Sequence, residues 1–278
     1  MNLNDVQILY RHSADHVRGA FGGSKEQASQ HYRRYVNFVL KHATKCPSRI
    51  LDIGCGNGWS TWLFRQEDHE AYGTDLHAGP LEAQRIDESI PYVSADVQRL
   101  PFADATFDLV AMHAVLEHVP RPEQALQECL RVLRTGGRVV IVGPHLLSVG
   151  ISLRVVCQET LKALRSGGRW MRRGPKTAFH PFGNTLPETY WFLGHHARRT
   201  VKKLIGENPV RFLSRQPDQK PPFHSDNDAC YFCNPMDLIG WARQTPGVRA
   251  IHWWASDRRL ARFFWPFAGG TWVVLEKS

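Results

Sequence analysis

The chain has 278 residues, of which 42% are hydrophobic and 22% charged, and its formal net charge at pH 7 is +9. This apolar content excludes an intrinsically disordered chain and is enough for one large α/β domain with a substantial insertion. No basic, apolar leader opens the sequence, and no run approaches the roughly 18 apolar residues of a membrane-spanning helix. We therefore expect a soluble, cytoplasmic protein, and association with a membrane surface stays open.

The six cysteines are scattered along the chain, as expected of reduced thiols in a cytosolic protein. Cys230 and Cys233 have C-x-x-C spacing, but no second pair or nearby histidine pair completes a metal site. We predict ordinary buried thiols and no metal site, with a redox or metal role as the alternative.

Residues 1–45 have a polar, helical pattern. The apolar positions of its second half recur at helical spacing and should pack on the sheet just before the first strand; they are Tyr32, Tyr35, Val36, Val39 and Leu40. Two interpretations remain open, a plain packing helix and a helix that also covers a cofactor bound at the sheet.

Residues 49–59 predict a strand, a glycine-rich turn and the start of a helix. The apolar run at 49–53 contains Asp52, glycines follow at positions 54, 56 and 58, and a helical pattern occupies 60–66. Glycines let the backbone approach a ligand, and the helix N-terminus offers unpaired N–H groups. A dinucleotide fingerprint would require a small residue where Trp59 stands, so NAD and FAD are disfavoured.

Two short predicted strands follow, Glu70–Asp75 and Pro91–Asp96, and each ends in an acid. Asp75 comes 21 positions after Gly54, close to the roughly 20-residue spacing at which Rossmann-like folds place a ribose-binding carboxylate. Two adjacent ribose hydroxyls can donate to one bidentate acceptor. Asp96 is either a second ligand or only a turn residue or helix cap.

The next elements are a strand at Phe107–Met112, an amphipathic helix at Pro122–Leu133 and a strand at Arg138–Val142. We expect the glycines at 136 and 137 to cap this helix at its C-terminus. Strands that alternate with helices over 49–143 predict a doubly wound, mostly parallel sheet with its ligand at the C-terminal edge of the strands.

Four motifs in this order resemble class I S-adenosylmethionine (SAM)-dependent methyltransferases of the small-molecule, Methyltransferase-11-like type. They are D-x-G-x-G-x-G at 52–58, the acid at 75, Asp-Val at 96–97 with its following turn, and the run at 107–144. That run contains L-E-H-V at 116–119 and E-x-x-R-V-L-x-x-G-G at 128–137. One departure is Thr135, where the family usually has proline; this is a loop substitution.

The resemblance covers about half of the chain and implies SAM as cofactor and methyl transfer (EC 2.1.1.-) as the activity. It also implies a Rossmann-like, seven-stranded sheet, mostly parallel with an antiparallel C-terminal edge strand. In this family the acid that matches Asp96 contacts the adenine amino group, for which a carboxylate is a fitting acceptor. The residues expected to bind the cofactor are Asp52, Gly54, Cys55, Gly56, Gly58, Asp75, Leu76, Asp96, Val97 and His113.

After the fifth predicted strand the pattern changes to basic, aromatic helical segments. Residues 151–220 contain 14 lysines and arginines against 4 acids, so the positive charge of the chain is localised here. Related methyltransferases build the lid over the acceptor at this place. The segment is a structural cap, a lid for an anionic or lipid-linked acceptor that rests on a membrane surface, or a nucleic-acid-binding segment.

From residue 228 the ordinary topology should resume, with a proline-started helix at 234–243 and strands at 248–254 and 270–276. The two strands are expected to form an antiparallel edge hairpin. The predicted organisation is a helical segment at 1–45, a SAM-binding core at 46–145, an insertion at 146–227, and a C-terminal part at 228–278 that completes the core.

Methyl transfer from SAM is an in-line displacement whose activation is built into the sulfonium, so the protein chiefly positions the reactants and removes water. A sugar hydroxyl would also need a general base, usually histidine. His145, just after the fifth strand, is the first candidate for this base. His118 is the second, with a structural role as its alternative, and His180 and His224 are weaker candidates.

We therefore predict a SAM-dependent methyltransferase that acts on a small or lipid-linked acceptor, with oxygen as the favoured atom. A nucleic-acid (RNA) methyltransferase is the first rival, but residues 112–115 read Met-His-Ala-Val where base-amino methylation families have N/D-P-P-Y/F. The second rival is a non-catalytic binding protein on the same fold. The intact acids and glycines of the cofactor motifs disfavour it.

Overall fold

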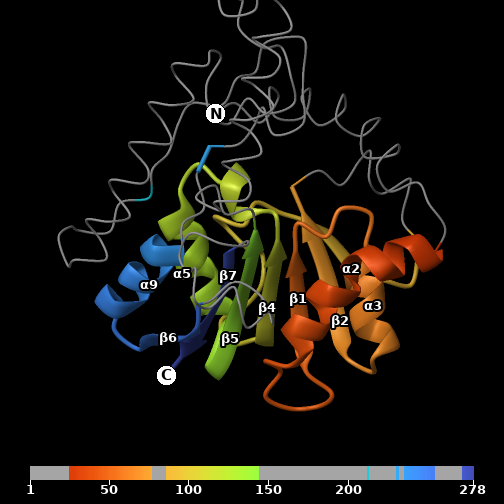
Figure 1. Cartoon of the computed structure of the whole chain (residues 1–278), viewed down its shortest axis with the longest axis horizontal. Helices are drawn as coiled ribbons and strands as arrows, with labels where there is room; N and C mark the ends of the chain where they lie inside the picture. The colour runs from red at the N-terminus through yellow and green to blue at the C-terminus, as the bar shows by residue number, and fades with distance from the viewer. Residues whose placement is uncertain (1–24, 77–85, 144–211, 213–229, 232–234, 254–270) are drawn as a thin grey trace, which may run out of the picture.

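The computed structural model describes residues 25–76, 86–143, 212, 230–231, 235–253 and 271–278, which form a seven-stranded sheet with helices on both faces (Figure 1). The strands are β1 (Arg49–Ile53), β2 (Glu70–Asp75), β3 (Tyr92–Ser94), β4 (Phe107–His113), β5 (Leu133–Gly143), β6 (Val248–His252) and β7 (Thr271–Lys277). The helices are α2 (Lys25–Leu40), α3 (Trp59–Gln66), the 3-10 helix η1 (Leu116–His118), α5 (Pro122–Val132) and α9 (Pro235–Gln244). Within these ranges, no helix has both the length and the apolar character that crossing a bilayer requires.

The strand order is β3-β2-β1-β4-β5-β7-β6. Strands β1 to β5 pair in parallel, while β7 runs antiparallel to both of its neighbours, β5 and β6. The predicted doubly wound, mostly parallel sheet with an antiparallel C-terminal strand is confirmed. The antiparallel strand β7 lies one place in from the edge, which β6 forms.

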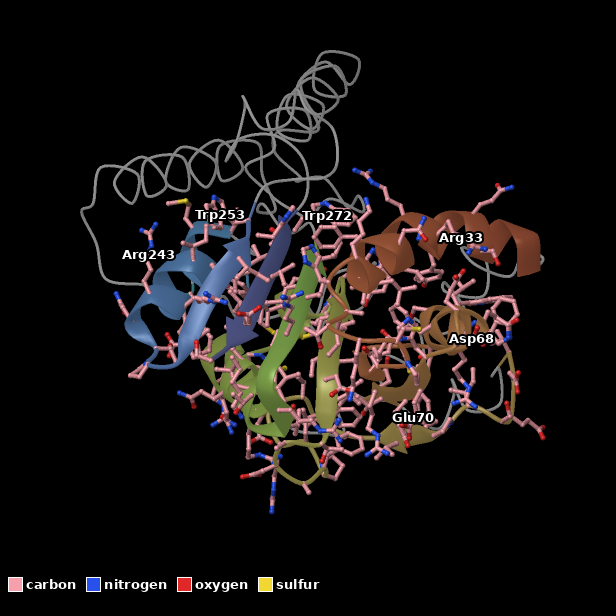
Figure 2. All side chains as sticks on the ribbon, turned by 90° about the horizontal axis from the view of Figure 1, so that it is seen from below. Arg33, Asp68, Glu70, Arg243, Trp253 and Trp272 are labelled. Carbon is pink, nitrogen blue, oxygen red and sulfur yellow. The ribbon has the colours of Figure 1, made fainter. Side chains whose placement is uncertain are left out.

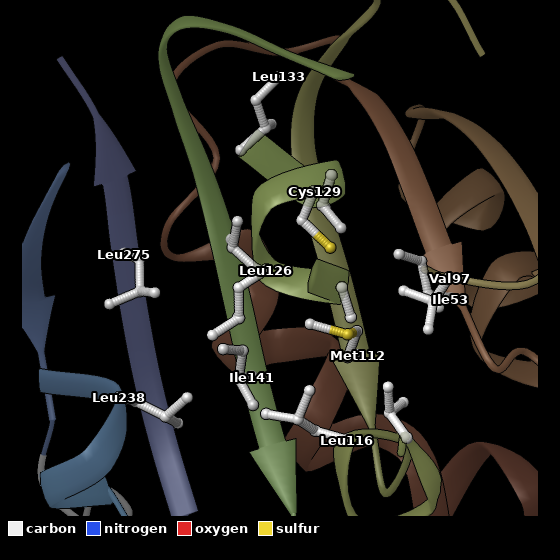
Figure 3. Close-up of a cluster of buried hydrophobic side chains, with 14 of the residues drawn as sticks. Ile53, Val97, Met112, Leu116, Leu126, Cys129, Leu133, Ile141, Leu238 and Leu275 are labelled. Carbon is white, nitrogen blue, oxygen red and sulfur yellow. The ribbon is translucent and has the colours of Figure 1, made fainter. Parts of the chain in front are cut away.

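The sheet is buried on both faces, which explains why its central strands are nearly continuous apolar runs. Ile50 of β1 faces a cluster with α2 and α3, while its neighbour Leu51 faces a cluster with α5 and α9. Figure 3 shows the second cluster, in which Leu126 and Cys129 of α5 lie over β4 and β5.

Helix α2 packs on the first face through its apolar stripe, as predicted. Tyr35, Val36, Phe38 and Val39 are buried there. Trp272 of β7 lies beside the same helix (Figure 2) and contacts the Phe38 ring at a centroid distance of 4.8 Å, whereas Arg33 pairs with Glu67 at 3.0 Å. The helix therefore spans the central strands and reaches β7.

The predicted glycine cap of α5 is wrong. The helix ends at Val132, and Leu133 is the C-cap residue, with extended backbone and its N–H bonded to the Cys129 carbonyl. Leu133 already pairs with Phe107 of β4, so β5 begins there and not at Arg138. Gly137 lies within this strand, where a Cβ atom would come within 2.8 Å of the Arg134 carbonyl oxygen. Pairing with β4 thus ends the helix earlier than the glycines suggest.

The ends of two other strands also differ from the prediction. The third strand covers only Tyr92–Ser94, because Asp96 already turns and accepts a hydrogen bond from the Gln98 N–H. Strand β6 ends at His252. The remaining strand bounds agree with the prediction to within one residue, so the parallel strands deliver the predicted acids to one edge.

Candidate functional site

The glycine turn after β1 lies at the point where the strand order reverses, between β2 on one side and β4 on the other. Gly54, Gly56 and Gly58 all have positive φ angles (68°, 55° and 96°), which glycine adopts without strain. A Cβ atom on Gly54 would lie 2.2 Å from Val115 Cγ2, so the turn touches the loop after β4. Open α/β sheets bind their ligands at such a switch point.

Asp52, just before the turn, is buried with 1% of its surface exposed. Its carboxylate accepts hydrogen bonds from Ser60 Oγ and Thr61 Oγ1, both at 2.6 Å, and from the Tyr35 hydroxyl at 3.4 Å. Burial raises the pKa of Asp52 to about 6, although these hydrogen bonds lower it. Asp52 therefore joins β1 to the first turn of α3 and to α2.

Asp75 lies beside the same turn, as its spacing predicts. The Gly56 N–H donates to Asp75 Oδ2 at 3.0 Å, and the Gly54 N–H donates to the Thr74 carbonyl at 2.7 Å. A Cβ atom on Gly73 of β2 would lie 2.7 Å from the Cys55 sulfur, so this glycine lets the turn pack on β2. Sequence reasoning missed Gly73, although a glycine inside a strand signals such a close approach.

Asp96 and Val97 follow β3 at the same edge. The Asp96 carboxylate accepts hydrogen bonds from both the backbone N–H and the side-chain amide of Gln98, at 2.8 to 3.1 Å. Leu76, the residue after β2, lies close by, because its carbonyl accepts a hydrogen bond from the Ser94 hydroxyl at 3.5 Å. The fold thus brings the predicted residues of β2 and β3 together.

The E-x-x-R motif holds the loop that follows Asp96. Glu128 accepts a hydrogen bond from the Leu100 N–H at 2.9 Å and pairs with Arg131. Arg131 in turn donates to the carbonyls of Leu100 (2.9 Å) and Phe102 (2.7 Å). The structure thus assigns a role to the E-x-x-R motif, for which the sequence alone indicated none.

His113 is the last residue of β4, and α2 covers it with aromatic rings. Ring centroids of Tyr35, Tyr32 and His31 lie 4.8, 5.8 and 6.5 Å from the imidazole. Burial, with a smaller contribution from His31, lowers the pKa of His113 to about 4. The imidazole is therefore neutral near pH 7, and α2 covers the edge of the sheet where the switch point lies.

His118, in η1, lies at a junction with the C-terminal part of the chain. The Cys230 thiol donates to the His118 carbonyl at 3.5 Å, and the N–H groups of Cys230 and Tyr231 donate to the Glu117 carbonyl. The first base candidate, His145, lies outside the described residues, as do His180, His224, Cys233 and all of the predicted insertion except Phe212. In the part of the chain that the structure describes, no group of three or more metal-ligating side chains comes together.

Residues 51–141 match the model of the family described as Methyltransferase domain. Malonyl-(acyl-carrier protein) O-methyltransferase of Erwinia pyrifoliae is 33% identical over 45% of this chain and 49% of its own length. Ubiquinone biosynthesis O-methyltransferase of Nitrosococcus oceani is 33% identical over 37% of this chain and 47% of its own. Demethylmenaquinone methyltransferase of Clavibacter sepedonicus is 38% identical over 34% of this chain and 40% of its own length. The chain thus spans about half the length, or less, of these curated relatives.

Among solved structures, the 1,6-didemethyltoxoflavin-N1-methyltransferase of Burkholderia thailandensis, with its substrate and S-adenosylhomocysteine (SAH) bound, has a TM-score of 0.53. It is 17% identical and covers 99% of this chain and 88% of its own, so it shows a shared fold. Residues 51–141 therefore match a methyltransferase domain of the class I, SAM-dependent type, and the strand order of the sheet agrees with this match.

Proposed function

We propose that the protein transfers a methyl group from SAM to a small or lipid-linked acceptor, at an oxygen atom. The observation that carries the proposal is the glycine turn held against Asp75 at the switch point of the sheet. The rival interpretation, a non-catalytic binding protein on the same fold, does not require an intact turn of this kind.

The residues at this edge fit SAM. A Cβ atom on Gly56 would meet nothing within 4 Å, so the turn leaves open space next to Asp75. Asp75 would accept hydrogen bonds from the ribose hydroxyls, and Asp96 from the adenine amino group. Cys55, Leu76 and Val97 would line the site between them, and the turn at 54–58, whose N–H groups at Gly54 and Gly56 are bonded to Thr74 and Asp75, would let the ligand approach its backbone closely. When bound, SAM supplies a methyl group on a positively charged sulfonium.

The protein's own part in the transfer is to orient the reactants and to exclude water. The rings of α2 around His113 support this role at the end of β4, next to the glycine turn. His145 stays our first candidate for a general base and His118 the second. The His118 carbonyl is engaged with Cys230, which favours a partly structural role for this residue.

The names of the relatives support the choice of acceptor. Two are O-methyltransferases, one for malonyl-(acyl-carrier protein) and one in ubiquinone biosynthesis. A small acceptor on a long carrier or tail would suit the basic, aromatic segment at 146–227 in one of its three interpretations, that of a lid for an anionic or lipid-linked acceptor at a membrane surface. Nucleic acid remains the less favoured acceptor.

Calorimetric titration of SAM and SAH into the protein and an Asp75→Ala variant tests the cofactor site. We expect micromolar binding by the wild type and at least a tenfold loss in the variant, because the ribose hydroxyls lose their acceptor. Glu70→Ala removes an acid from the other end of the same strand and should leave the affinity unchanged. A wild type that binds neither compound would instead favour the non-catalytic alternative.

Transfer of a labelled methyl group then tests the acceptor. Candidate acceptors are offered as free carboxylates, phenols, lipid-linked saccharides and RNA. Label that enters RNA alone would contradict the small or lipid-linked acceptor, and label that resides on nitrogen or carbon in every product would contradict the oxygen atom. Either result would leave the cofactor site intact.

A further inference from the structure

Tyr35 connects a helix that lies outside the family match to two parts of the cofactor site. It belongs to α2, which precedes the matched residues 51–141, and only 2% of its surface is exposed. Its hydroxyl donates to Asp52 Oδ1 at 3.4 Å, and its ring lies 4.8 Å from the His113 ring and 6.0 Å from the Phe64 ring. One side chain thus touches the ends of β1 and β4 and the helix α3.

The partner of this hydroxyl is a buried carboxylate held by hydroxyl groups. Ser60 and Thr61 donate to one oxygen of Asp52, and Tyr35 donates to the other. Burial disfavours the charged form of a carboxylate. A buried carboxylate therefore stays ionised only when hydrogen-bond donors stabilise its charged form. The titratable groups that surround Asp52 are Tyr32 and Tyr35 on α2, Cys55 in the turn, Asp75 at the end of β2 and, beyond Tyr35, His113 on β4.

We propose that Tyr35 is a positioning residue of the cofactor site, whose hydroxyl supports the ionised form of Asp52 and whose ring seats α2 against the end of β4. Docking of α2 on the sheet is then part of SAM recognition. The inference rests on the proposed SAM site, and it assigns a function to a residue that no cofactor motif contains.

The charge of the cofactor makes SAM binding sensitive to the ionisation of Asp52. The sulfonium of SAM is positively charged, whereas the thioether of SAH is neutral. Two neighbouring carboxylates, Asp52 and Asp75, favour the cation when both are ionised. SAM affinity should therefore depend on the ionisation of Asp52 more strongly than SAH affinity does. Transfer of the methyl group removes the positive charge, so this electrostatic attraction is lost for the product SAH.

The test compares Tyr35→Phe with the wild type in titrations of SAM and SAH between pH 5 and pH 8, without acceptor. Asp52 is ionised above its pKa of about 6, so SAM affinity is full there and falls as the pH decreases through that value. The variant keeps the ring but removes one donor to the ionised carboxylate, so the fall should begin about half to one pH unit higher. In the falling part of the curve, SAM binding should be about three- to tenfold weaker than in the wild type.

Tyr72→Phe is the matched control, because the Tyr72 hydroxyl donates to the exposed Glu70 at the start of β2. This variant should keep the wild-type curve. Ionisation of SAM itself is common to all the proteins and cancels in the comparison.

An Asp52→Asn background distinguishes positioning from general loss of structure. In this background, SAM affinity should no longer decrease at acidic pH, and adding Tyr35→Phe should not change the pH dependence of SAM affinity further. A Tyr35→Phe protein with unchanged thermal unfolding and a wild-type pH curve would overturn the inference. So would an additional shift by Tyr35→Phe in the Asp52→Asn background. If the wild type binds no SAM at any pH, the proposed function itself fails, which is a separate result.

Discussion

At the scale of single residues, the glycines of the turn serve different purposes. Gly54 is required by the protein itself, since a Cβ atom there would overlap Val115. Gly56 has open space in the Cβ direction, so only its positive φ angle of 55° and a bound ligand would disfavour a side chain. In the proposed site, a side chain at Gly56 would therefore interfere with the bound cofactor and with little else.

Gly56→Ala tests this distinction. We expect a stability loss of about 1 kcal/mol from the left-handed backbone, together with a loss of SAM affinity of tenfold or more. Gly136→Ala is the control, because Gly136 also has a positive φ (77°) and open space but lies far along the chain, at the start of β5. Urea unfolding and calorimetry measure the two quantities. Equal effects of the two variants on SAM affinity would contradict our assignment of the site.

At the scale of elements, the edge of the sheet proposed to bind the cofactor is supported by α5, a helix that contributes no residue to that edge. Helix α5 lies over β4 and β5, yet its Arg131 reaches the loop between Asp96 and the next strand and binds two of its carbonyls. Glu128 completes the support by accepting the Leu100 N–H. The position of Asp96 and Val97 thus depends on the packing of α5.

Arg131→Met should therefore weaken cofactor binding from a distance. Hydrogen bonds from a charged donor contribute about 1.5–3 kcal/mol, so we expect a similar loss of stability and a several-fold loss of affinity for both SAM and adenosine. Arg249→Met removes an exposed arginine that pairs with Glu276 at the far edge of the sheet, and should cost no more than about 1 kcal/mol. Unchanged adenosine affinity in Arg131→Met would show that the loop does not need this support.

At the scale of the whole molecule, two buried groups give the stability opposite dependences on pH. Asp52 has a folded-state pKa of about 6, above the value of about 3.9 in an unfolded chain, so the folded state holds the extra proton and stability falls as the pH rises between them. His113 has a folded-state pKa of about 4, below the unfolded value of about 6.5, so its contribution rises over nearly the same interval. The two contributions partly cancel.

Single substitutions should separate them. Between pH 4 and pH 7, the stability of Asp52→Asn relative to the wild type should increase by about 3 kcal/mol, since two pKa units correspond to roughly that much. Over the same pH interval, the stability of His113→Gln relative to the wild type should decrease by a similar amount. Urea unfolding at several pH values gives both differences, and a pH-independent difference for either variant would contradict the corresponding pKa shift.

The sequence alone determined the features that arise from short stretches of chain. The spacing of apolar residues located β1, β2 and β4, and the glycine pattern located the turn, because local backbone geometry and side-chain alternation decide both. The distance from Gly54 to Asp75 placed that acid at the turn, since parallel strands bring their C-terminal ends to one edge of the sheet.

Only the tertiary structure decided the features that depend on residues far apart in the chain. Pairing with Phe107 ends α5 at Val132, and no local pattern reports such a partner. The contacts of Tyr35 with Asp52 and His113, and of Arg131 with the loop after β3, arise when separate helices pack on opposite faces of the sheet. These contacts exist only after the sheet has brought distant residues together, so the sequence showed the cofactor motifs but not what holds them in place.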